Sequence, residues 1–226
     1  MNPYQKSSLF SGKRILITAG PTREALDPVR YISNHSTGKM GYALAEAFLQ
    51  SGALVTLISG PVNLVLAHEH LNLIKVESAN EMFRQCSHYF DECEIALFTA
   101  AVADYRPEIT HLSKIKKTDD TFSLKMVRNR DIAVEFGKIK KPGQFSIGFA
   151  LESDNELENA RLKLIEKNFN LIILNSTNDA GATFGFDTNK ITIIDKLGRE
   201  QHFDLKLKSV LAFDILDSIA AQLKLV

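Results

Sequence analysis

Residues 33–39, with the sequence Ser-Asn-His-Ser-Thr-Gly-Lys, combine small hydrogen-bond donors and a lysine just before a segment with helical spacing. The free N–H groups and the dipole at a helix N-terminus favour a phosphate or a carboxylate, so this segment is a candidate anion site. Arg30 and Asn34 could reach one anionic ligand from the same connection, the first by charge and the second through an amide donor. Ordinary N-capping of a helix explains the same segment equally well.

Lysines form two further candidate anion sites. The run Lys-Ile-Lys-Lys at residues 114–117 could place one lysine over bound phosphates, although a solvated basic strand is the commoner explanation. Lys163 and Lys167 are four residues apart, which places them on one face of a helix, where they could together oppose a polyphosphate. Solvation at the surface is again the simpler alternative, so neither set establishes a function alone.

The common nucleotide-binding motifs do not fit this chain. No G-x-G-x-x-G follows Thr18, and Ser33 and Met40 stand where a P-loop needs glycine and Ser or Thr. These departures weaken the dehydrogenase and Walker-type interpretations. A Rossmann-type NAD(P) oxidoreductase stays an alternative because of the order of strands and helices, and an inactive nucleotide-binding partner subunit is a third hypothesis.

The composition limits the class of protein and its partners. The chain has 226 residues, 45% of them hydrophobic, which is enough for one sizeable domain, residues 1–226. Lysine plus arginine and aspartate plus glutamate both number 27, so no basic excess indicates nucleic acid or an anionic membrane as partner. No apolar run approaches the ~18 residues of a membrane span, and the first residues lack a signal-peptide pattern. We therefore expect a soluble, cytoplasmic protein.

Cys86 and Cys93 are seven residues apart and belong to no C-x-x-C motif or Cys/His cluster. This spacing predicts neither a zinc site nor a disulfide framework. The two residues are interpreted as thiols of the core, or near the surface, in a reducing compartment.

The pattern of apolar residues predicts a mainly parallel, doubly wound, Rossmann-like α/β sheet with helices on both faces. Polar segments at 104–128 break the rhythm and indicate a hairpin flap, and a capping box at 153–156 predicts a helix start. Strands are expected at 14–18, 54–59, 73–76, 95–100, 145–150 and 171–174, helices at 37–50, 79–90, 153–168 and 210–223, and a late hairpin around 190–198. Ligands of such sheets bind outside the carboxyl ends of the strands, so the site is expected after Thr18, Ala100, Ala150 and Leu174.

Long stretches of the chain are similar to one known family. The matching segments are 17–24, 27–41 and 99–107, with further agreement at 114–117 and 148–152, in the spacing of Ala160, Lys163, Lys167 and Asn168, and at Asn175. Together they resemble the phosphopantothenoylcysteine synthetase family, the synthetase half of the bacterial bifunctional coenzyme A biosynthesis protein. The resemblance covers residues 12–223.

The resemblance implies a ligase that joins 4'-phosphopantothenate to cysteine at the expense of CTP. The pantothenate carboxylate would attack the α-phosphorus of the nucleotide and expel pyrophosphate. Cysteine nitrogen would then attack the acyl-nucleotidylate and release CMP. Mg²⁺ and a lysine, by resemblance Lys114, would offset the repulsion between the carboxylate and the triphosphate. The Asn34 amide and the Ala101 N–H would stabilise the oxyanion of the second step, with Arg30 holding the intermediate.

The resemblance also implies which residues bind the two larger substrates, while the metal and cysteine ligands stay unknown. The segment 129–133 is expected to be a loop that reads the base. The expected nucleotide contacts are Ala100, Asp104, Lys114, Arg130, Asp131, Ile132, Ala133, Phe149, Lys163 and Lys167, and the expected phosphopantothenate contacts are Arg30, Asn34, Ser36, Gly38 and Lys39.

Two departures from the family pattern qualify these expectations. The usual Asn-Pro-Asp-Ile is Asn129-Arg130-Asp131-Ile132 here, which removes the fixed backbone angle of proline and adds a charge, so the preference for CTP over ATP is open. The flavin-dependent decarboxylase half of bifunctional relatives is absent from this sequence, so a separate decarboxylase is expected. Relatives build their site across a twofold dimer, which implies a homodimer.

Overall fold

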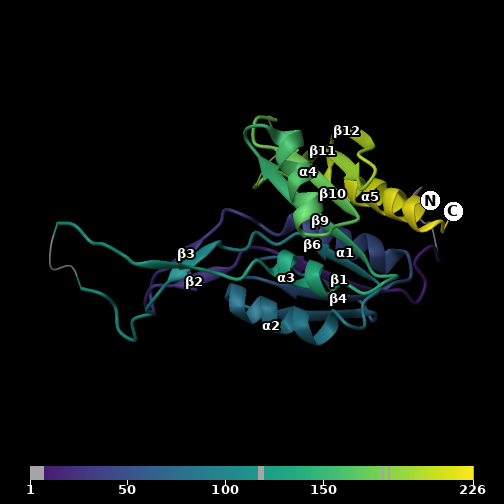
Figure 1. The fold of residues 1–226 in the computed structure, drawn as a ribbon. Helices are drawn as coiled ribbons and strands as arrows, with labels where there is room; N and C mark the ends of the chain where they lie inside the picture. The colour runs from purple at the N-terminus through teal and green to yellow at the C-terminus, as the bar shows by residue number, and fades with distance from the viewer. Residues whose placement is uncertain (1–7, 117–119, 180, 183, 226) are drawn as a thin grey trace.

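The structure of this chain is a computed structural model that describes residues 8–116, 120–179, 181–182 and 184–225. Its centre is an eight-stranded sheet with the order β12-β11-β10-β9-β6-β1-β4-β5 (Figure 1). The strands of this sheet are β1 (Arg14–Ala19), β4 (Leu54–Ser59), β5 (Leu71–Lys75), β6 (Ile95–Phe98), β9 (Phe145–Glu152), β10 (Leu171–Ser176), β11 (Thr188–Asp195) and β12 (Glu200–Leu207).

The sheet is parallel from β5 to β10 and antiparallel at the other edge. Strand β1 pairs in parallel with β4 and β6, and β9 pairs in parallel with β6 and β10. The hairpin of β11 and β12 closes the sheet antiparallel to β10. This arrangement confirms the predicted doubly wound, mainly parallel fold and the late hairpin.

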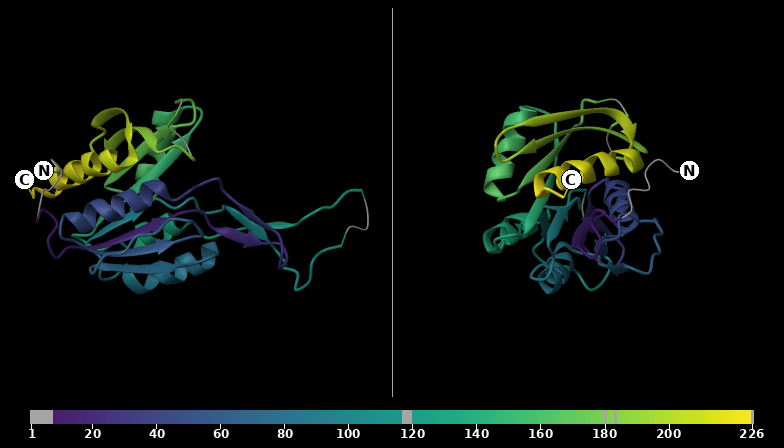
Figure 2. Two further views of the ribbon diagram at one scale, coloured as in Figure 1. Left: turned by 180° about the vertical axis from the view of Figure 1, so that it is seen from behind. Right: turned by 90° about the vertical axis from the view of Figure 1, so that its right-hand side faces the viewer.

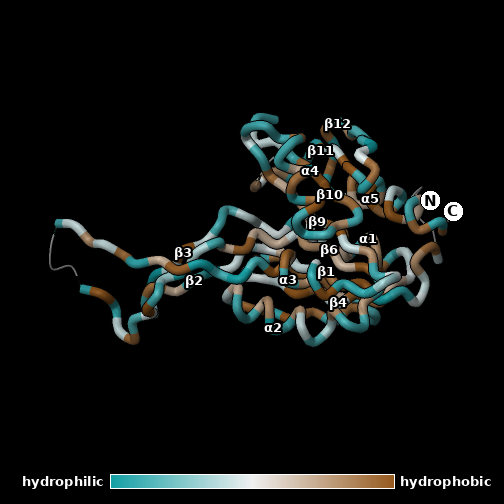
Figure 3. Tube along the Cα trace, viewed as in Figure 1, coloured by the Kyte–Doolittle hydropathy of each residue, from teal (hydrophilic) through white to brown (hydrophobic). Residues whose placement is uncertain are grey.

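Side chains alternate between the two faces of the sheet, and each face is covered by helices. Ile15 and Ile17 pack on the face of α1 (Lys39–Gln50) and α5 (Lys208–Leu223). Leu16 points to the opposite face, where α2 (Ala79–Tyr89), α3 (Ile132–Ile139) and α4 (Glu156–Glu166) lie. Because both faces are buried, the central strands β1, β6 and β10 are almost continuously apolar, and Figure 3 shows hydrophobic residues concentrated in the sheet.

Two small hairpins stand beside the main sheet. Strands β2 (Arg23–Ala25) and β3 (Tyr31–Ser33) form one, and β7 (Tyr105–Pro107) and β8 (Met126–Arg128) form the stem of the other. The described residues between β7 and β8, 108–116 and 120–125, which we call the arm, project far from the body of the molecule (Figures 1 and 2). The predicted flap is confirmed at its stem. Its two alternating runs, however, form no strand before Met126, and Lys117 lies outside the described residues.

Two local predictions are wrong. The helix α4 begins after Asn155, which has a left-handed φ of 44° and gives no side-chain cap, so residues 153–156 do not form a capping box. The Glu156 carboxylate instead accepts hydrogen bonds from Ser176 Oγ and Asn178 Nδ2. The expected base-reading loop also contains the first turn of α3, because Asp131 is the N-cap of that helix.

Cys86 and Cys93 are buried and form no disulfide, which confirms their interpretation as core thiols. Burial raises the pKa of the Cys93 thiol to about 12 and the pKa of the Cys86 thiol still further, so both stay protonated at neutral pH. In the described part of the chain, no helix combines the length and the apolar character needed to cross a membrane.

Candidate functional site

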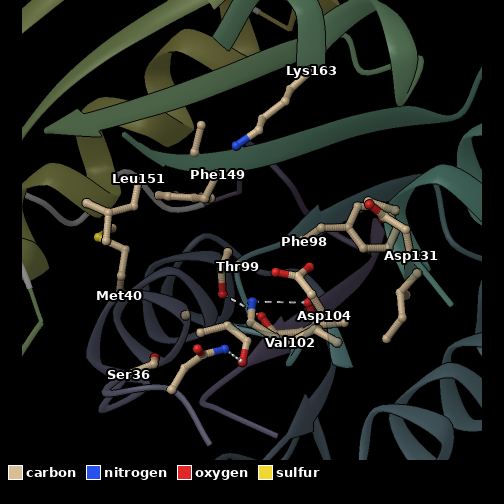
Figure 4. Close-up of a pocket in the computed structure, with 18 of the residues that line it drawn as sticks. Ser36, Met40, Phe98, Thr99, Val102, Asp104, Asp131, Phe149, Leu151 and Lys163 are labelled. Carbon is tan, nitrogen blue, oxygen red and sulfur yellow. Dashed lines mark hydrogen bonds between the residues drawn. The ribbon is translucent and has the colours of Figure 1, made fainter. Parts of the chain in front are cut away.

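A cavity of about 940 Å³ opens at the carboxyl ends of four neighbouring parallel strands. Thr18 of β1, Phe98 of β6, Phe149 of β9 and Asn175 of β10 all line it. Figure 4 shows side chains from several elements converging on this space, with Phe149 and Lys163 on one side and Asp104 facing them. The sequence predicts a site at the carboxyl ends of the parallel strands, and the cavity lies there.

The N-terminus of α1 forms one wall because two glycines allow close packing. Gly38 adopts a left-handed φ of 76°, and a Cβ there would come within 2.9 Å of Val62 Cγ1. A Cβ on Gly41 would lie 2.5 Å from Thr99 Oγ1, so only glycine lets the helix approach the sheet this closely. The Gly38 N–H donates to Ser36 Oγ at 3.3 Å. This packing brings Ser36, Gly38 and Lys39 to the cavity, as predicted.

Asn34 and Ala101 meet at the cavity wall, but not in the expected way. Asn34 Nδ2 donates to the Ala101 carbonyl at 2.9 Å, and the Ala101 N–H donates to the Gly20 carbonyl at 2.9 Å. The Ala101 N–H is thus engaged in a backbone bond between the segments that follow β1 and β6, and its role as an oxyanion donor stays a prediction. A carboxamide carries two N–H donors, so Asn34 has one further donor for a ligand.

The opposite part of the cavity gathers two lysines and a helix N-terminus. Lys167 forms an ion pair with Asp131 at 2.9 Å, and Lys163 forms one with Glu152. Asp131 also accepts a hydrogen bond from the Val134 N–H at 3.1 Å, which caps α3 and leaves the earlier N–H groups of the first turn without intrahelical partners. The region therefore offers cationic and N–H donors, while each lysine is held by a carboxylate that an anion would have to displace.

A second pair of lysines lies at the end of the cavity near α1 and α5. Lys39 Nζ forms an ion pair with Asp187 at 2.7 Å and donates to the Gly185 carbonyl at 2.9 Å. Lys208 Nζ donates to the Phe186 carbonyl at 2.6 Å. Burial, and then the nearby charge of Lys39, lower the pKa of Lys208. An anion between these two ammonium groups would relieve their repulsion.

Arg30 and Lys114 are the predicted site residues that do not line the cavity of their own chain. Arg30 Nη2 donates to the buried Asp27 carboxylate at 2.6 Å and to the Ile115 carbonyl at 3.1 Å, while the Ile115 N–H donates to Asp27 at 3.1 Å. These bonds hold the Asp27 pKa well below its usual range and tie Arg30 to the arm. Lys114 is exposed on the arm beside this anchor.

The other predicted site residues come together. The predicted residues that line the cavity are Asn34, Ser36, Gly38, Lys39, Ala100, Ala101, Asp104, Arg130, Asp131, Ile132, Ala133, Phe149, Lys163 and Lys167. Their presence at one cavity is a fact of geometry, whereas the ligand that each contacts stays a prediction.

Several polar residues of the cavity wall were not predicted as site residues, among them Asn189, Lys208 and Asn175, of which only Asn175 was part of the family resemblance. Each continues a buried stripe that the sequence displays. Asn175 follows Leu171 and Ile173 at a spacing of two, and Lys208 lies three residues before Leu211 of α5. A polar residue in phase with a buried stripe was therefore the available signal.

The described residues contain no group of three or more His, Cys, Asp or Glu side chains arranged to hold a metal ion. Asp104, Asp131 and Glu166 nevertheless line the cavity separately. Mg²⁺ usually keeps several waters and binds one or two carboxylates together with substrate phosphates, so these residues fit a metal that arrives with a nucleotide.

Comparison with known proteins shows the family of this chain. Residues 10–223 match the model of the DNA/pantothenate metabolism flavoprotein C-terminal domain. The chain has the fold of a crystal structure of the C-terminal domain of coenzyme A biosynthesis bifunctional protein CoaBC, with a TM-score of 0.81 and 39% identity over 96% of this chain and 98% of that one. The chain therefore belongs to the DNA/pantothenate metabolism flavoprotein C-terminal domain family.

The similar full-length proteins carry two different names. The chain is 45% identical over 217 residues to coenzyme A biosynthesis bifunctional protein CoaBC of Bacillus subtilis (strain 168), covering 96% of this chain and 53% of that protein. It is 48% identical over 210 residues to a protein of an unknown prokaryotic organism named cysteine/cysteine sulfinic acid decarboxylase, covering 93% of this chain and 58% of that protein. The chain thus spans about half the length of the curated relatives it matches.

Proposed function

We propose that this chain is a ligase that joins 4'-phosphopantothenate to cysteine through an acyl-cytidylate, with CTP as the energy source. The observation that carries the proposal is the cavity itself, which has lysines and a helix N-terminus on one side and Asn34 beside a second helix N-terminus on the other. Such a site can hold two anionic substrates with their reacting groups between them. Membership of the family and the similarity to a CoaBC domain support this choice of substrates.

In the first step, the pantothenate carboxylate attacks the α-phosphorus of CTP and pyrophosphate leaves. Lys163 and Lys167 would exchange their carboxylate partners, Glu152 and Asp131, for phosphate oxygens. The N–H groups of Ile132 and Ala133 would face the nucleotide from the first turn of α3. The chemistry is chiefly positioning and charge stabilisation, because both reacting groups are anions.

In the second step, the cysteine amine attacks the acyl carbon and CMP leaves. The tetrahedral intermediate places negative charge on the former carbonyl oxygen, so a fixed donor is needed there. Asn34 supplies the donor in this proposal, because its amide is positioned by the bond to the Ala101 carbonyl. The Ala101 N–H contributes only if its bond to Gly20 opens.

Mg²⁺ is part of the proposal as a companion of CTP. When bound, it would offset charge on the triphosphate, with Asp104 or Asp131 as carboxylate ligands on the cavity wall. The protein side chains would position the nucleotide and exclude water around it.

We include a homodimer in the proposal because Lys114 and Arg30 lie outside the cavity of their own chain. The arm that carries Lys114 extends away from the body (Figure 2), in a position to reach a second copy. A twofold dimer would exchange two arms between two cavities, so each site would be completed by the other chain. The buried free thiols suit a reducing compartment, and a cytoplasmic location is the remaining part of the proposal.

The test is pyrophosphate release with phosphopantothenate and Mg²⁺, comparing CTP, ATP, GTP and UTP with and without cysteine, with products identified by mass. Phosphopantothenoylcysteine and CMP formed with CTP would support the proposal. The same product with ATP alone would retain the ligase and overturn the choice of nucleotide. A parallel reaction with cysteine or cysteine sulfinic acid alone measures CO₂, and CO₂ release without ligation would replace the proposal with a decarboxylase.

A further inference from the structure

Asn175 is a half-buried residue with one unusual side-chain atom. Its Oδ1 atom is the one buried side-chain N or O atom that has no hydrogen-bond partner, among the residues that the structure describes. Buried polar groups in folded proteins nearly always have partners, because an unpaired one loses its bonds to water without replacement. An acceptor kept in this state at a cavity wall is suited to a donor that arrives with a ligand.

The strand fixes the direction of this side chain. Leu171 and Ile173 of β10 pack into the core on the face of α1 and α5, and side chains alternate along a strand. Asn175 is therefore on that face, at the carboxyl end of the strand, where it lines the cavity. Its neighbour in register is Leu151 of β9, which Figure 4 shows beside Met40 and on the opposite side of the pocket from Asp131.

The chemistry around Asn175 limits what it can bind. Lys39 and Lys208, at the same end of the cavity, are donors, so this end can attract an anion. A carboxamide oxygen cannot itself bind an anion and instead needs an O–H or N–H group. The ligand part at this end should therefore combine a negative group with a neutral donor close to it. Phosphopantothenate has this combination, because its chain carries a hydroxyl and an amide N–H beyond the phosphate.

We propose that Asn175 is a specificity-determining residue of the ligase, whose Oδ1 accepts a hydrogen bond from the hydroxyl or the amide N–H of the pantothenoyl chain. This inference rests on the proposed function. It assigns to Asn175 the recognition of the pantothenoyl chain and no part in the chemical steps. An acyl substrate without this donor would leave Asn175 Oδ1 buried and without a hydrogen bond, so it would bind more weakly than phosphopantothenate. Sites that hydrogen-bond a substrate in this way reject analogues lacking the group more strongly than apolar pockets reject a size difference.

The experiment compares wild type, Asn175→Leu and Asn175→Ala with phosphopantothenate, with its deoxy analogue lacking the hydroxyl, and with its N-methylated amide. We expect Asn175→Leu to raise KM for phosphopantothenate about tenfold, with KM for CTP and for cysteine changed less than about twofold. With wild type, kcat/KM for one of the two analogues should be about tenfold lower than kcat/KM for phosphopantothenate. With the Asn175 variants, that analogue and phosphopantothenate should have equal kcat/KM. That analogue identifies the donor.

Thermal unfolding separates this role from a structural one. Because Oδ1 has no described partner in the unliganded protein, Asn175→Leu should unfold at the same temperature as wild type or higher. Asn178→Leu is the matched control, since this exposed asparagine lies three residues further on and its Nδ2 donates to the Ser153 carbonyl at 3.0 Å. The control should leave KM for phosphopantothenate unchanged.

Several outcomes would overturn the inference. An unchanged KM for phosphopantothenate in both Asn175 variants would do so, as would an increase confined to cysteine or CTP, or equal losses with both analogues in every variant. If wild type neither binds nor converts phosphopantothenate, the proposed function fails first. If wild type converts it and the variants behave as wild type, the ligase stands and only the role of Asn175 fails.

Discussion

The cavity and the arm differ in how the fold supports them. The cavity is built on the ends of buried parallel strands, and nearby groups hold some of its polar residues, as Asp131 holds Lys167 and the Ala101 carbonyl holds Asn34. The arm leaves the body on a three-residue ladder and carries Lys114 in solvent. The difference teaches that the cavity is formed within one chain, whereas Lys114 would reach a cavity only through the proposed dimer. Each prediction below tests this division.

The largest expected effect comes from the arm. Lys114→Gln should reduce pyrophosphate release in the first step by roughly 10²–10³-fold, because one charge that offsets the triphosphate is lost. Thermal stability should not change, since Lys114 is exposed. Lys116→Gln, on the same arm, is the control and should retain near wild-type rates. Single-turnover measurement of acyl-cytidylate formation gives the rate directly.

Mixing variants distinguishes an arm that serves its own cavity from one that serves a partner. Co-expression of Lys114→Gln with Asn34→Asp should restore up to about a quarter of wild-type activity, because mixed dimers contain one cavity with both residues intact. No recovery in verified mixed dimers would contradict delivery of the arm to the second chain.

A somewhat smaller effect is expected inside the cavity. Asn34→Asp should slow the second step by about 10²-fold, because a carboxylate replaces the donor at the oxyanion. The acyl-cytidylate should then accumulate, which quenched-flow sampling and mass analysis can detect. If the first step slows equally, Asn34 acts in binding and the proposed separation of roles is wrong.

The carboxylate of Asp27 anchors the arm by binding Arg30 and the Ile115 N–H. Its loss should reduce activity less than the substitutions of Lys114 and Asn34. Asp27→Asn should lower kcat about tenfold and the melting temperature by several degrees, because Arg30 and the Ile115 N–H lose their charged partner. The affinity for CTP, measured by calorimetry, should stay within a factor of about three of wild type.

The Asp27 anchor also has a pH signature. Since the folded protein holds the Asp27 pKa below its usual range, the carboxylate contributes stability above its ordinary pKa of about 4, and this contribution is lost as the pH falls through the lowered value. The difference in melting temperature between wild type and Asp27→Asn should be constant from about pH 8 to about pH 5 and narrow below about pH 4. A constant difference down to about pH 2 would contradict the sign of the shift.

The smallest effect is expected at Arg130, just before the first turn of α3. Arg130 lies over the ring of Phe83, with Cζ 5.0 Å from the ring centroid, and precedes the N-cap Asp131. Restoring the family residue by Arg130→Pro should change the ratio of kcat/KM for CTP and ATP by less than about threefold, because the first-turn N–H groups stay in place. A change above about tenfold would show that Arg130 itself sets nucleotide preference.

The regular parts of this fold were predictable because burial on two faces leaves a strong signal. The apolar runs of β1, β6 and β10 and the helical spacing of α5 are visible in the sequence, and their order implies where the strand ends meet. The three-residue strands β2 and β3 escaped prediction, because their pairing depends on tertiary contacts rather than on a pattern of their own.

The sequence predicted which residues line the cavity better than it predicted their hydrogen-bond partners. The similarity of long segments pointed to Asn34, Asp104 and Lys163, all of which line the cavity. The sequence did not indicate that Ala101 N–H is already bonded to Gly20, because parallel bridges depend on strand register. Nor did it reveal that Arg30 is anchored to the arm, since that bond joins residues 85 positions apart.

The ends of the described chain lie together, far from the arm (Figure 1). Leu9 and Leu225 both pack against the core that contains α1 and α5, at the opposite pole of the molecule. A tether, a fluorescent label or a fused domain joined at either end would therefore enter where it obstructs neither the cavity mouth nor the reach of the arm. Molecules immobilised through that pole would present their arms to solution, which makes arm exchange measurable one molecule at a time.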